Sequence, residues 1–261
     1  LGGEVKGQFL PTADKNLDLR YNQYRMRESP AACLRIAKGI VCRKIRNYAA
    51  FYRTIQKNTP LPGISDLLTW MEKQAATAAT ATDAASLFGT EGITAAAHFS
   101  QYGQLFTGDL KFTGRSKHPP LDEVNAMLSF GYALLYKLIN GMLVSAGLDP
   151  YAGFLHRDRY NRAGLTCDFQ EFFRANVIDA LVLKVCNLNM LQSTHFTTTD
   201  QGVRFTKEGI VIFLNAWKEV AYPTHTPELV NEITGVITIL TKEIRQFAAQ
   251  QVVTEDVPDH L

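Results

Sequence analysis

Two carboxylates and one imidazole lie close together in the stretch HRDRYNRAGLTCDFQEFFR, residues 156–174. His156 stands in a polar segment, and Asp168 and Glu171 follow three residues apart, which places both carboxylates on one face of a helix. Carboxylate oxygens and an imidazole nitrogen suit Mg²⁺ or Mn²⁺, and the nitrogen favours Mn²⁺. A structural alternative stays open, in which Glu171 pairs with Arg174 one turn away, Asp168 caps a helix or is solvated, and His156 is an ordinary loop residue.

A third carboxylate, Glu91, stands in the segment LFGTEGITAAAHF, where we expect the start of a helix of small and apolar residues. It adds an oxygen donor to the metal interpretation. An acidic residue at a helix start is also favoured by the helix dipole, so Glu91 alone indicates a structural role.

Cations accumulate in residues 31–57, which hold seven Lys and Arg and no acidic residue. Solvated helix faces usually mix the signs, because opposite charges one turn apart stabilise a helix and like charges do not. The run therefore favours a track for phosphates, and the alternative is a partner protein with an acidic surface. Residues 1–60 carry 12 Lys and Arg against 4 Asp and Glu, or +8, although the whole chain carries only +2. Tyr48, Phe51 and Tyr52 could stack on bases, but their spacing is more typical of a core.

The elements that must position these side chains are helical almost throughout. Apolar spacing predicts helices over 31–57, 64–86 (one helix or a pair), 91–106, 122–146, 165–193, 206–217 and 227–249. Residues 196–205 predict one small hairpin that turns at Asp200-Gln201-Gly202. We expect an all-α fold, in which residues 1–22 are a linker or the last strand of a preceding part, residues 23–249 form a multi-helix domain and residues 250–261 are a tail.

The run from Ala126 to Ala146 is long and apolar enough to imitate a membrane helix. It contains Lys137 and Asn140, and no second such run follows. A central helix buried on all sides by its neighbours is therefore the prediction, with no membrane as partner.

Composition excludes several other classes. With 46% apolar and 20% charged residues in 261, the chain can bury a large core and is not intrinsically disordered. The four cysteines show no CxxC spacing, which excludes a zinc ribbon and predicts buried thiols in a reducing cytoplasm. No GxSxG, Walker, GxGxxG or HExxH motif occurs, and the remaining histidines, which have no partner at ligand spacing, receive no role. The chain opens at Leu1 without a signal segment, as a fragment or processed product would.

The sequence closely resembles the Cas-one family of CRISPR-associated adaptation integrases. Its helix Pro120–Tyr132 is similar to the family's Pro-Asp-x-x-Asn-Ala-x-Leu-Ser-x-x-Tyr pattern. Ala146–His156 (AGLDPYAGFLH) and Asp168–Arg174 (DFQEFFR) match two further family patterns, and Glu91-Gly92 matches the upstream Glu-Gly. The resemblance covers about residues 15–225.

This resemblance implies one divalent cation, Mg²⁺ or Mn²⁺, held by Glu91, His156 and Glu171, with Asp168 beside them. The implied reaction is that of a metal-dependent endonuclease and integrase, in which a 3′-hydroxyl of a short DNA fragment attacks a phosphodiester at a repeat boundary of a CRISPR array. The implied partners are protospacer and repeat DNA, a homodimeric full-length form, a small dimeric Cas-two protein and, in some members, a fused reverse transcriptase. The residues that we expect to contact phosphate are Arg43, Lys44, Arg46, Arg157, Arg159 and Arg162.

Two alternatives stay open. One is a transposon-borne homologue, a casposase, which performs the same chemistry on mobile-element ends. The other is a non-catalytic helical DNA-binding scaffold, which the presence of Glu91, His156 and Glu171 disfavours. Because the family's N-terminal β-rich domain is reduced here to at most residues 1–22, we expect the chain alone to bind metal and DNA without completing two-ended integration.

Overall fold

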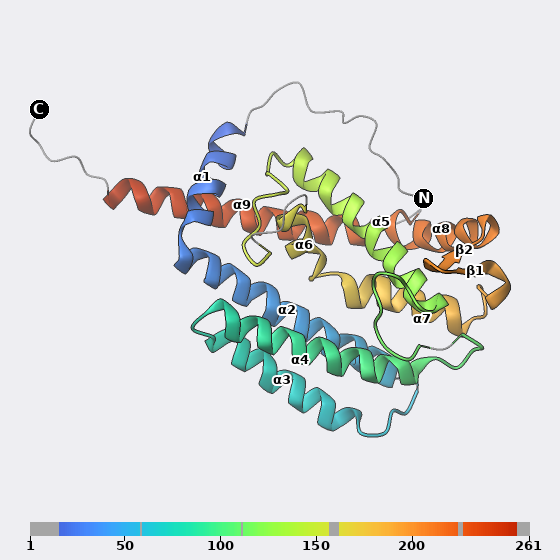
Figure 1. Ribbon diagram of the computed structural model, residues 1–261. Coiled ribbons are helices and arrows are strands. Elements are labelled where there is room, and N and C mark those ends of the chain that lie inside the picture. Colours follow the sequence, from blue (N-terminus) through green and yellow to red (C-terminus); the bar gives the residue numbers. More distant parts are fainter. Residues whose placement is uncertain (1–15, 58, 111, 157–161, 224–226, 255–261) are drawn as a thin grey trace, which may run out of the picture.

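Helices account for most of the chain in the computed structural model, which describes residues 16–57, 59–110, 112–156, 162–223 and 227–254 (Figure 1). The helices within these residues are α1 (Leu17–Glu28), α2 (Pro30–Gln56), α3 (Ile64–Thr80), α4 (Ala84–Tyr102), α5 (Glu123–Ser145), α6 (Gly164–Gln170), α7 (Ala180–Asn187), α8 (Lys207–Ala221) and α9 (Glu228–Thr254). Strands β1 (Phe196–Thr199) and β2 (Gly202–Phe205) form one antiparallel hairpin. The all-α prediction with one small hairpin is confirmed.

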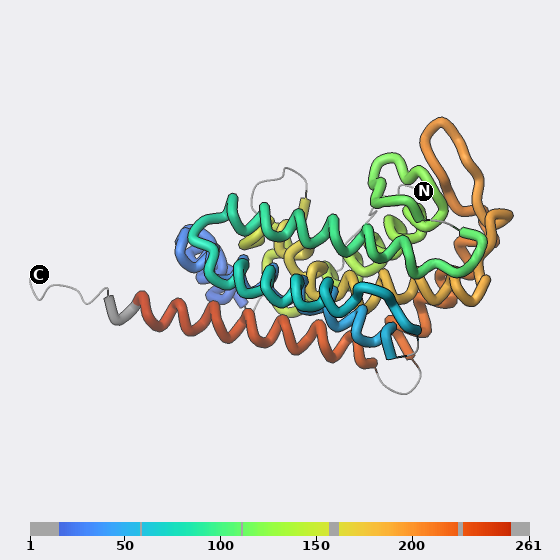
Figure 2. The backbone as a smooth tube through the Cα atoms, turned by 90° about the horizontal axis from the view of Figure 1, so that it is seen from below, coloured from blue at the N-terminus to red at the C-terminus, as the bar shows by residue number. Residues whose placement is uncertain are grey.

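The basic helix α2 lies at the centre of the fold. It packs against α3 and α4 on one side and against the segment between α6 and α7 on the other. Figure 2 shows α3 and α4 side by side on the outer face, with α9 running along the edge of the molecule. Apolar spacing in residues 31–57 predicts one stripe, which consists of Leu34, Ala37, Val41, Ile45, Ala49 and Tyr52. Leu34 is partly buried, and the other five are buried. Because α2 is covered from two sides, residues outside that stripe, such as Ile40 and Tyr48, are buried as well.

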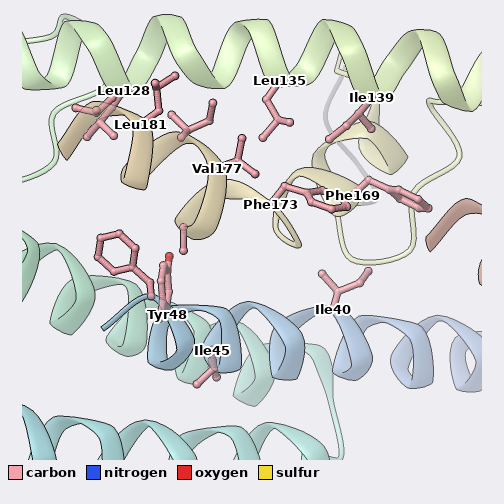
Figure 3. Close-up of a cluster of buried hydrophobic side chains, with 14 of the residues drawn as sticks. Ile40, Ile45, Tyr48, Leu128, Leu135, Ile139, Phe169, Phe173, Val177 and Leu181 are labelled. Atoms are coloured by element: carbon pink, nitrogen blue, oxygen red, sulfur yellow. The ribbon is translucent and has the colours of Figure 1, made fainter. Parts of the chain in front are cut away.

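Between α2 and α5, the segment from Phe169 to Leu181 fills the core with Phe169, Phe173 and Val177 (Figure 3). The apolar periodicity of residues 165–193 is shared among several elements and does not form one continuous helix. Helix α6 ends at Gln170, a turn follows, and Arg174–Asp179 form a π-helical segment, η2, that leads into α7. Wider helical turns of this kind occur mostly as short pieces and often at functional sites.

Helix α5 begins at its predicted cap: Asn125 donates its backbone N–H to the Asp122 carboxylate at 2.6 Å. Within the described residues it is the one helix long and apolar enough to cross a membrane. Its buried residues belong to the common core, but it is not buried on all sides as expected. Small and polar residues one turn apart leave one stripe of it exposed: Ala133, Lys137, Gly141 and Ser145.

The two ends of the helical region reach further than predicted. Leu17–Asn22, expected in the linker, belong to α1, which packs on α9. The buried Gln23 amide donates to the carbonyl oxygens of Asp149 and Ala152 at 2.9 and 3.2 Å, so α1 also anchors the turn after α5. Helix α9 continues to Thr254, into the expected tail. Residues 1–15 and 255–261 lie outside the described residues.

Candidate metal centre and nucleic-acid groove

The carboxylates of Glu91 and Glu171 converge on one cationic group, the ammonium of Lys44. Lys44 Nζ donates to Glu91 Oε1 in a short contact and lies 2.7 Å from Glu171 Oε2. The Lys44 and Glu171 side chains are only 6% and 2% exposed, against 19% for Glu91. Three helices thus deliver one positive and two negative groups to the same point.

Glu91 reaches this point from within α4, not from a helix start as expected. Helix α4 begins seven residues earlier because Asp83 caps it, accepting the backbone N–H of Ser86 at 2.8 Å. The dipole explanation for Glu91 is therefore wrong, since the effect fades beyond the first turn. Lys44 comes from the middle of α2, and Glu171 caps the end of α6.

Arg174 completes the charge balance around Glu171. Its guanidinium lies 2.7 Å from Glu171 Oε1, which confirms the expected pair one turn apart. Burial alone would raise the pKa of Glu171, but the Arg174 and Lys44 charges lower it to about 2. The same carboxylate raises the pKa of Lys44, against its burial, so the ammonium stays charged. Despite the close contact, Glu171 Oε2 accepts no well-oriented hydrogen bond from the described residues.

The lowered pKa makes folding stability depend on pH. The Glu171 pKa falls from 4.5 to about 2 on folding, so its contribution is fully present above pH 4.5 and lost as the pH falls through about 2. That contribution is about 3 kcal/mol, at 1.36 kcal/mol per pKa unit. We expect Glu171→Gln to lose this much stability at pH 7 and to flatten the acid limb of urea unfolding measured from pH 7 to pH 2. An equally steep acid limb in the variant would contradict this assignment.

Asp168 holds the loop that carries His156. Its carboxylate accepts the backbone N–H groups of Phe154, Leu155 and His156 at 2.7, 3.0 and 2.9 Å. A fourth contact joins Asp168 Oδ1 to His156 Nδ1 at 2.7 Å. Asp168 is fully buried and neither caps a helix nor faces solvent, so the structural alternative for it was wrong. Because Nδ1 is fixed in this way, Nε2 is the ring nitrogen that can face a ligand.

Two glycines permit this arrangement. A Cβ on Gly153 would lie 2.5 Å from the Gly164 carbonyl carbon, and one on Gly164 would lie 2.2 Å from the His156 carbonyl oxygen. Only glycine allows the loop after α5 to touch the start of α6 so closely. The contact brings the backbone of residues 154–156 within reach of the Asp168 carboxylate.

The chemistry of Glu91, Glu171 and His156 fits a divalent cation. Two carboxylates already share one positive charge, a buried carboxylate oxygen lacks a hydrogen-bond donor among the described residues, and an oriented imidazole borders the same groove. Oxygen donors with one nitrogen suit Mg²⁺ or Mn²⁺. In the described part of the chain, no three His, Cys, Asp or Glu side chains are yet close enough to form a metal cluster.

These side chains line a groove of about 1480 Å³. Helices α2, α4 and α5, the loop before α5 and the loop after it supply the walls, and the exposed stripe of α5 lies along one of them. The cations on its lining outnumber the acidic side chains Glu91, Asp149 and Glu171; they are Arg20, Lys44, Arg115, Lys117, Lys137, Arg162 and Arg174. Partial burial and the charges of Arg174 and Arg115 lower the pKa of Lys117, as expected where like charges crowd.

Of the residues expected to contact phosphate, Arg162 lines this groove and Lys44 lies at its floor. Lys44 is buried and paired with carboxylates instead of facing an open track. Arg43 and Arg46 are exposed on α2, outside the groove lining. Arg157 and Arg159 lie outside the described residues.

The charge of α2 is also compensated more than its sequence suggested. Arg35 pairs with Glu243 of α9 at 2.7 Å, and Arg53 pairs with Glu72 of α3 at 2.7 Å. The partners lie on other helices, where spacing along α2 cannot reveal them. The core alternative for the aromatic residues of α2 is confirmed, since Tyr48, Phe51 and Tyr52 are buried.

A buried polar network holds Tyr132, one of the groove-lining residues, in place. Asp179 accepts the Tyr132 hydroxyl at 2.5 Å and contacts His98 Nε2 at 3.0 Å. The Tyr132 ring in turn lies under the Arg174 guanidinium, 4.9 Å from its centroid. No partner for His98 could be predicted from local spacing, because Asp179 follows 81 residues later. Arg174, Lys117 and Arg115 were likewise not predicted as groove residues, because the groove joins segments that are far apart in the sequence.

Comparisons with known proteins agree on one family. The family described as "CRISPR associated protein Cas1" matches residues 2–219. "CRISPR-associated endonuclease Cas1 2" of Rhodospirillum rubrum is 35% identical over 216 residues, covering 78% of this chain and 62% of that protein. The chain thus spans about three fifths of the length of this curated relative.

Solved structures share the fold. A Cas1 protein from Thermotoga maritima superposes with a TM-score of 0.80 at 24% identity, covering 91% of this chain and 74% of the other. A chain of a Cas6-RT-Cas1–Cas2 complex superposes with a TM-score of 0.80 at 21% identity, covering 92% of this chain and 26% of the other. With most of its length matched by the family, and with the motifs around Glu91, His156 and Glu171 placed along one groove, the chain belongs to the Cas1 family of CRISPR-associated proteins.

Proposed function

We propose that the chain is the catalytic part of a metal-dependent DNA integrase that inserts short DNA fragments into a CRISPR array. The observation that carries the proposal is the convergence of Glu91 and Glu171 on the Lys44 ammonium, in a basic groove that His156 also lines. A helical scaffold that only binds DNA needs neither the buried carboxylate pair nor the anchored histidine loop.

The proposed reaction is a transesterification. The 3′-hydroxyl of the incoming fragment attacks a phosphodiester at the repeat boundary, one P–O bond forms, and the bond to the leaving 3′-oxygen of the array strand breaks. Glu91, His156 Nε2 and Glu171 would hold Mg²⁺ or Mn²⁺, which lowers the pKa of an attacking hydroxyl and offsets charge at phosphorus when bound. The remaining task of the protein is to position both strands.

The groove cations would perform that positioning through phosphate contacts. Arg162 and Lys117 line the same groove as the carboxylate pair, and Lys137 extends the positive lining along α5. Arg43 and Arg46 stay proposed phosphate contacts on the outer face of α2, and Arg157 and Arg159 stay proposals near His156. Contacts of this kind give affinity without sequence preference.

Removing one phosphate contact should change the salt dependence of binding. We expect Arg162→Ala to weaken binding to duplexes of any sequence and to reduce the slope of log K against log salt by about 0.9. Arg46→Ala is the matched test of the outer face, measured by fluorescence anisotropy on the same duplexes. An unchanged slope for Arg162→Ala would exclude the groove as the phosphate path, and an unchanged slope for Arg46→Ala would exclude only the outer face.

The assembly proposed for the full-length protein is a cytoplasmic homodimer with a small dimeric Cas2 partner. The likeness to a chain of a solved Cas6-RT-Cas1–Cas2 complex supports this choice, and a fused reverse transcriptase is part of the proposal only through that likeness. The 35% identical relative is a CRISPR-associated Cas1 protein, which favours an array over transposon ends as target.

The proposed function is tested by strand transfer with labelled fragment and repeat DNA. We expect single-ended joining that requires a free 3′-hydroxyl and Mg²⁺ or Mn²⁺, and two-ended joining only with the small partner. Glu91→Gln serves as the inactive control. No joined product under any metal condition, in a sample that binds DNA, would leave the scaffold alternative as the better account.

A further inference from the structure

We propose that the Lys44 ammonium is a counter-cation that holds the Glu91 and Glu171 carboxylates together before the metal binds. When the metal binds, the ammonium moves into the groove. This inference rests on the proposed metal site. Lys44 is not one of the proposed metal ligands, and its role here is to position two of them. After displacement, its ammonium would contact a phosphate of the DNA substrate.

The position of the Lys44 ammonium excludes its sharing the site with a divalent ion. It lies 2.7 Å from Glu171 Oε2 and closer still to Glu91 Oε1. A metal held by the same two carboxylates would lie about 2.0–2.3 Å from their oxygens. Two cations would then be nearly in contact in a buried site, where repulsion is strongest. One of them must move, and the metal carries the larger charge.

The lysine can move without disturbing the fold. Only its side chain is engaged, on a flexible four-carbon stem, while the α2 backbone is fixed by packing on both sides. Lys44 already lines the basic groove, so the displaced ammonium would move from the carboxylates into the groove, where a phosphate would lie. Arg174 remains on Glu171 Oε1, so this carboxylate keeps a partner throughout the exchange.

The poor orientation of the Lys44–Glu171 contact favours exchange. Glu171 Oε2 is buried and without a hydrogen-bond donor among the described residues, although the ammonium is at contact distance. Lys44 donates its directed hydrogen bond to Glu91. The ammonium therefore satisfies one carboxylate better than the other and leaves an acceptor for which a metal ion competes.

Two consequences follow from such an exchange. Lys44 lowers the metal affinity of the free protein, because the state that can accept metal is only a fraction of the population. A DNA phosphate that binds the released ammonium favours the metal-bound state, and by linkage DNA then raises metal affinity. In Lys44→Met both effects should be absent.

The test is calorimetric titration of the full chain with Mn²⁺, with and without a short DNA duplex. We expect Lys44→Met to bind Mn²⁺ at least about tenfold more tightly than the wild-type chain. We expect DNA to strengthen Mn²⁺ binding in the wild-type chain and not in Lys44→Met. Lys73→Met is the matched control, because it removes one lysine charge at an exposed position of α3 that is outside the groove lining.

Equal or weaker Mn²⁺ binding by a folded Lys44→Met chain would overturn the inference, while joining activity of the wild-type chain would still support the proposed function. Lys44→Gln, which keeps a polar end, is the second variant if the methionine chain does not fold. In the wild-type chain, ¹⁵N spectra of lysine ammonium groups give an independent reading. The signal of the buried Lys44 should vanish or shift at saturating Mg²⁺, and an unmoved signal would also overturn the inference.

Discussion

Replacing His156 by alanine is expected to lower the rate of DNA strand transfer by about a thousandfold or more. His156 is the one nitrogen donor proposed for the metal, and a catalytic metal contributes several kcal/mol to transition-state stabilisation, with a factor of ten for each 1.36 kcal/mol. DNA affinity should stay within about twofold, because phosphates are bound by the groove cations and not by the imidazole.

The measurement is single-turnover joining at saturating protein, with binding followed by anisotropy on the same DNA. His118→Ala is the matched control, since His118 lines the same groove without lying at the carboxylate pair. A His156→Ala chain that joins DNA at more than a tenth of the wild-type rate would remove His156 from the catalytic set. Parallel loss of joining and binding would instead indicate that the loop is part of the DNA surface.

Replacing Asp168 by alanine is expected to lower the free energy of unfolding by about 4 kcal/mol. The carboxylate accepts three backbone N–H groups and contacts His156, and a buried donor left without a partner costs about 1–3 kcal/mol. Urea unfolding at pH 7 measures the loss, with Asp66→Ala on the exposed first turn of α3 as control. A change below about 1 kcal/mol, similar to that of an exposed site, would contradict this account of the loop.

The role that we propose for Asp168 is therefore to position His156 and not to bind the metal. Its four acceptor contacts leave it turned toward the loop backbone and the imidazole. Losing such a partner of a metal-bound histidine typically costs 10–100-fold in metal affinity. Sequence spacing placed Asp168 and Glu171 together, but it could not show that one carboxylate orients the loop and the other faces the cation.

The sequence alone predicted most helices because apolar periodicity reports which face is buried. The stripe of α2, the Asp122 cap of α5, the hairpin and the Thr206 cap of α8 all follow from local patterns. Sequence patterns did not predict the features that depend on tertiary contacts. Leu19 is buried only because α1 packs against α9, so Leu17–Asn22, the first part of α1, were mistaken for a linker.

The residues of the candidate site could be proposed from the sequence, but their arrangement in space could not. Family patterns named Glu91, His156 and Glu171, but Lys44 looked like any other cation of a basic helix. Its partners stand 47 and 127 residues away on other elements, and no local rule joins such positions. The turn at residues 171–173, which sends Arg174 back onto Glu171, interrupts an apolar pattern that reads as one helix.

In the proposed site, Glu91, His156 and Glu171 together hold one divalent cation. Pulsed electron paramagnetic resonance of Mn²⁺ bound to the full chain can detect this coordination, because electron spin echo modulation is sensitive to a coordinated ¹⁴N nucleus. We expect one Mn²⁺ per chain with a single histidine nitrogen coupling, which disappears in His156→Ala and persists in His118→Ala. Tightly bound Mn²⁺ without nitrogen coupling, or a coupling that survives in His156→Ala, would contradict it.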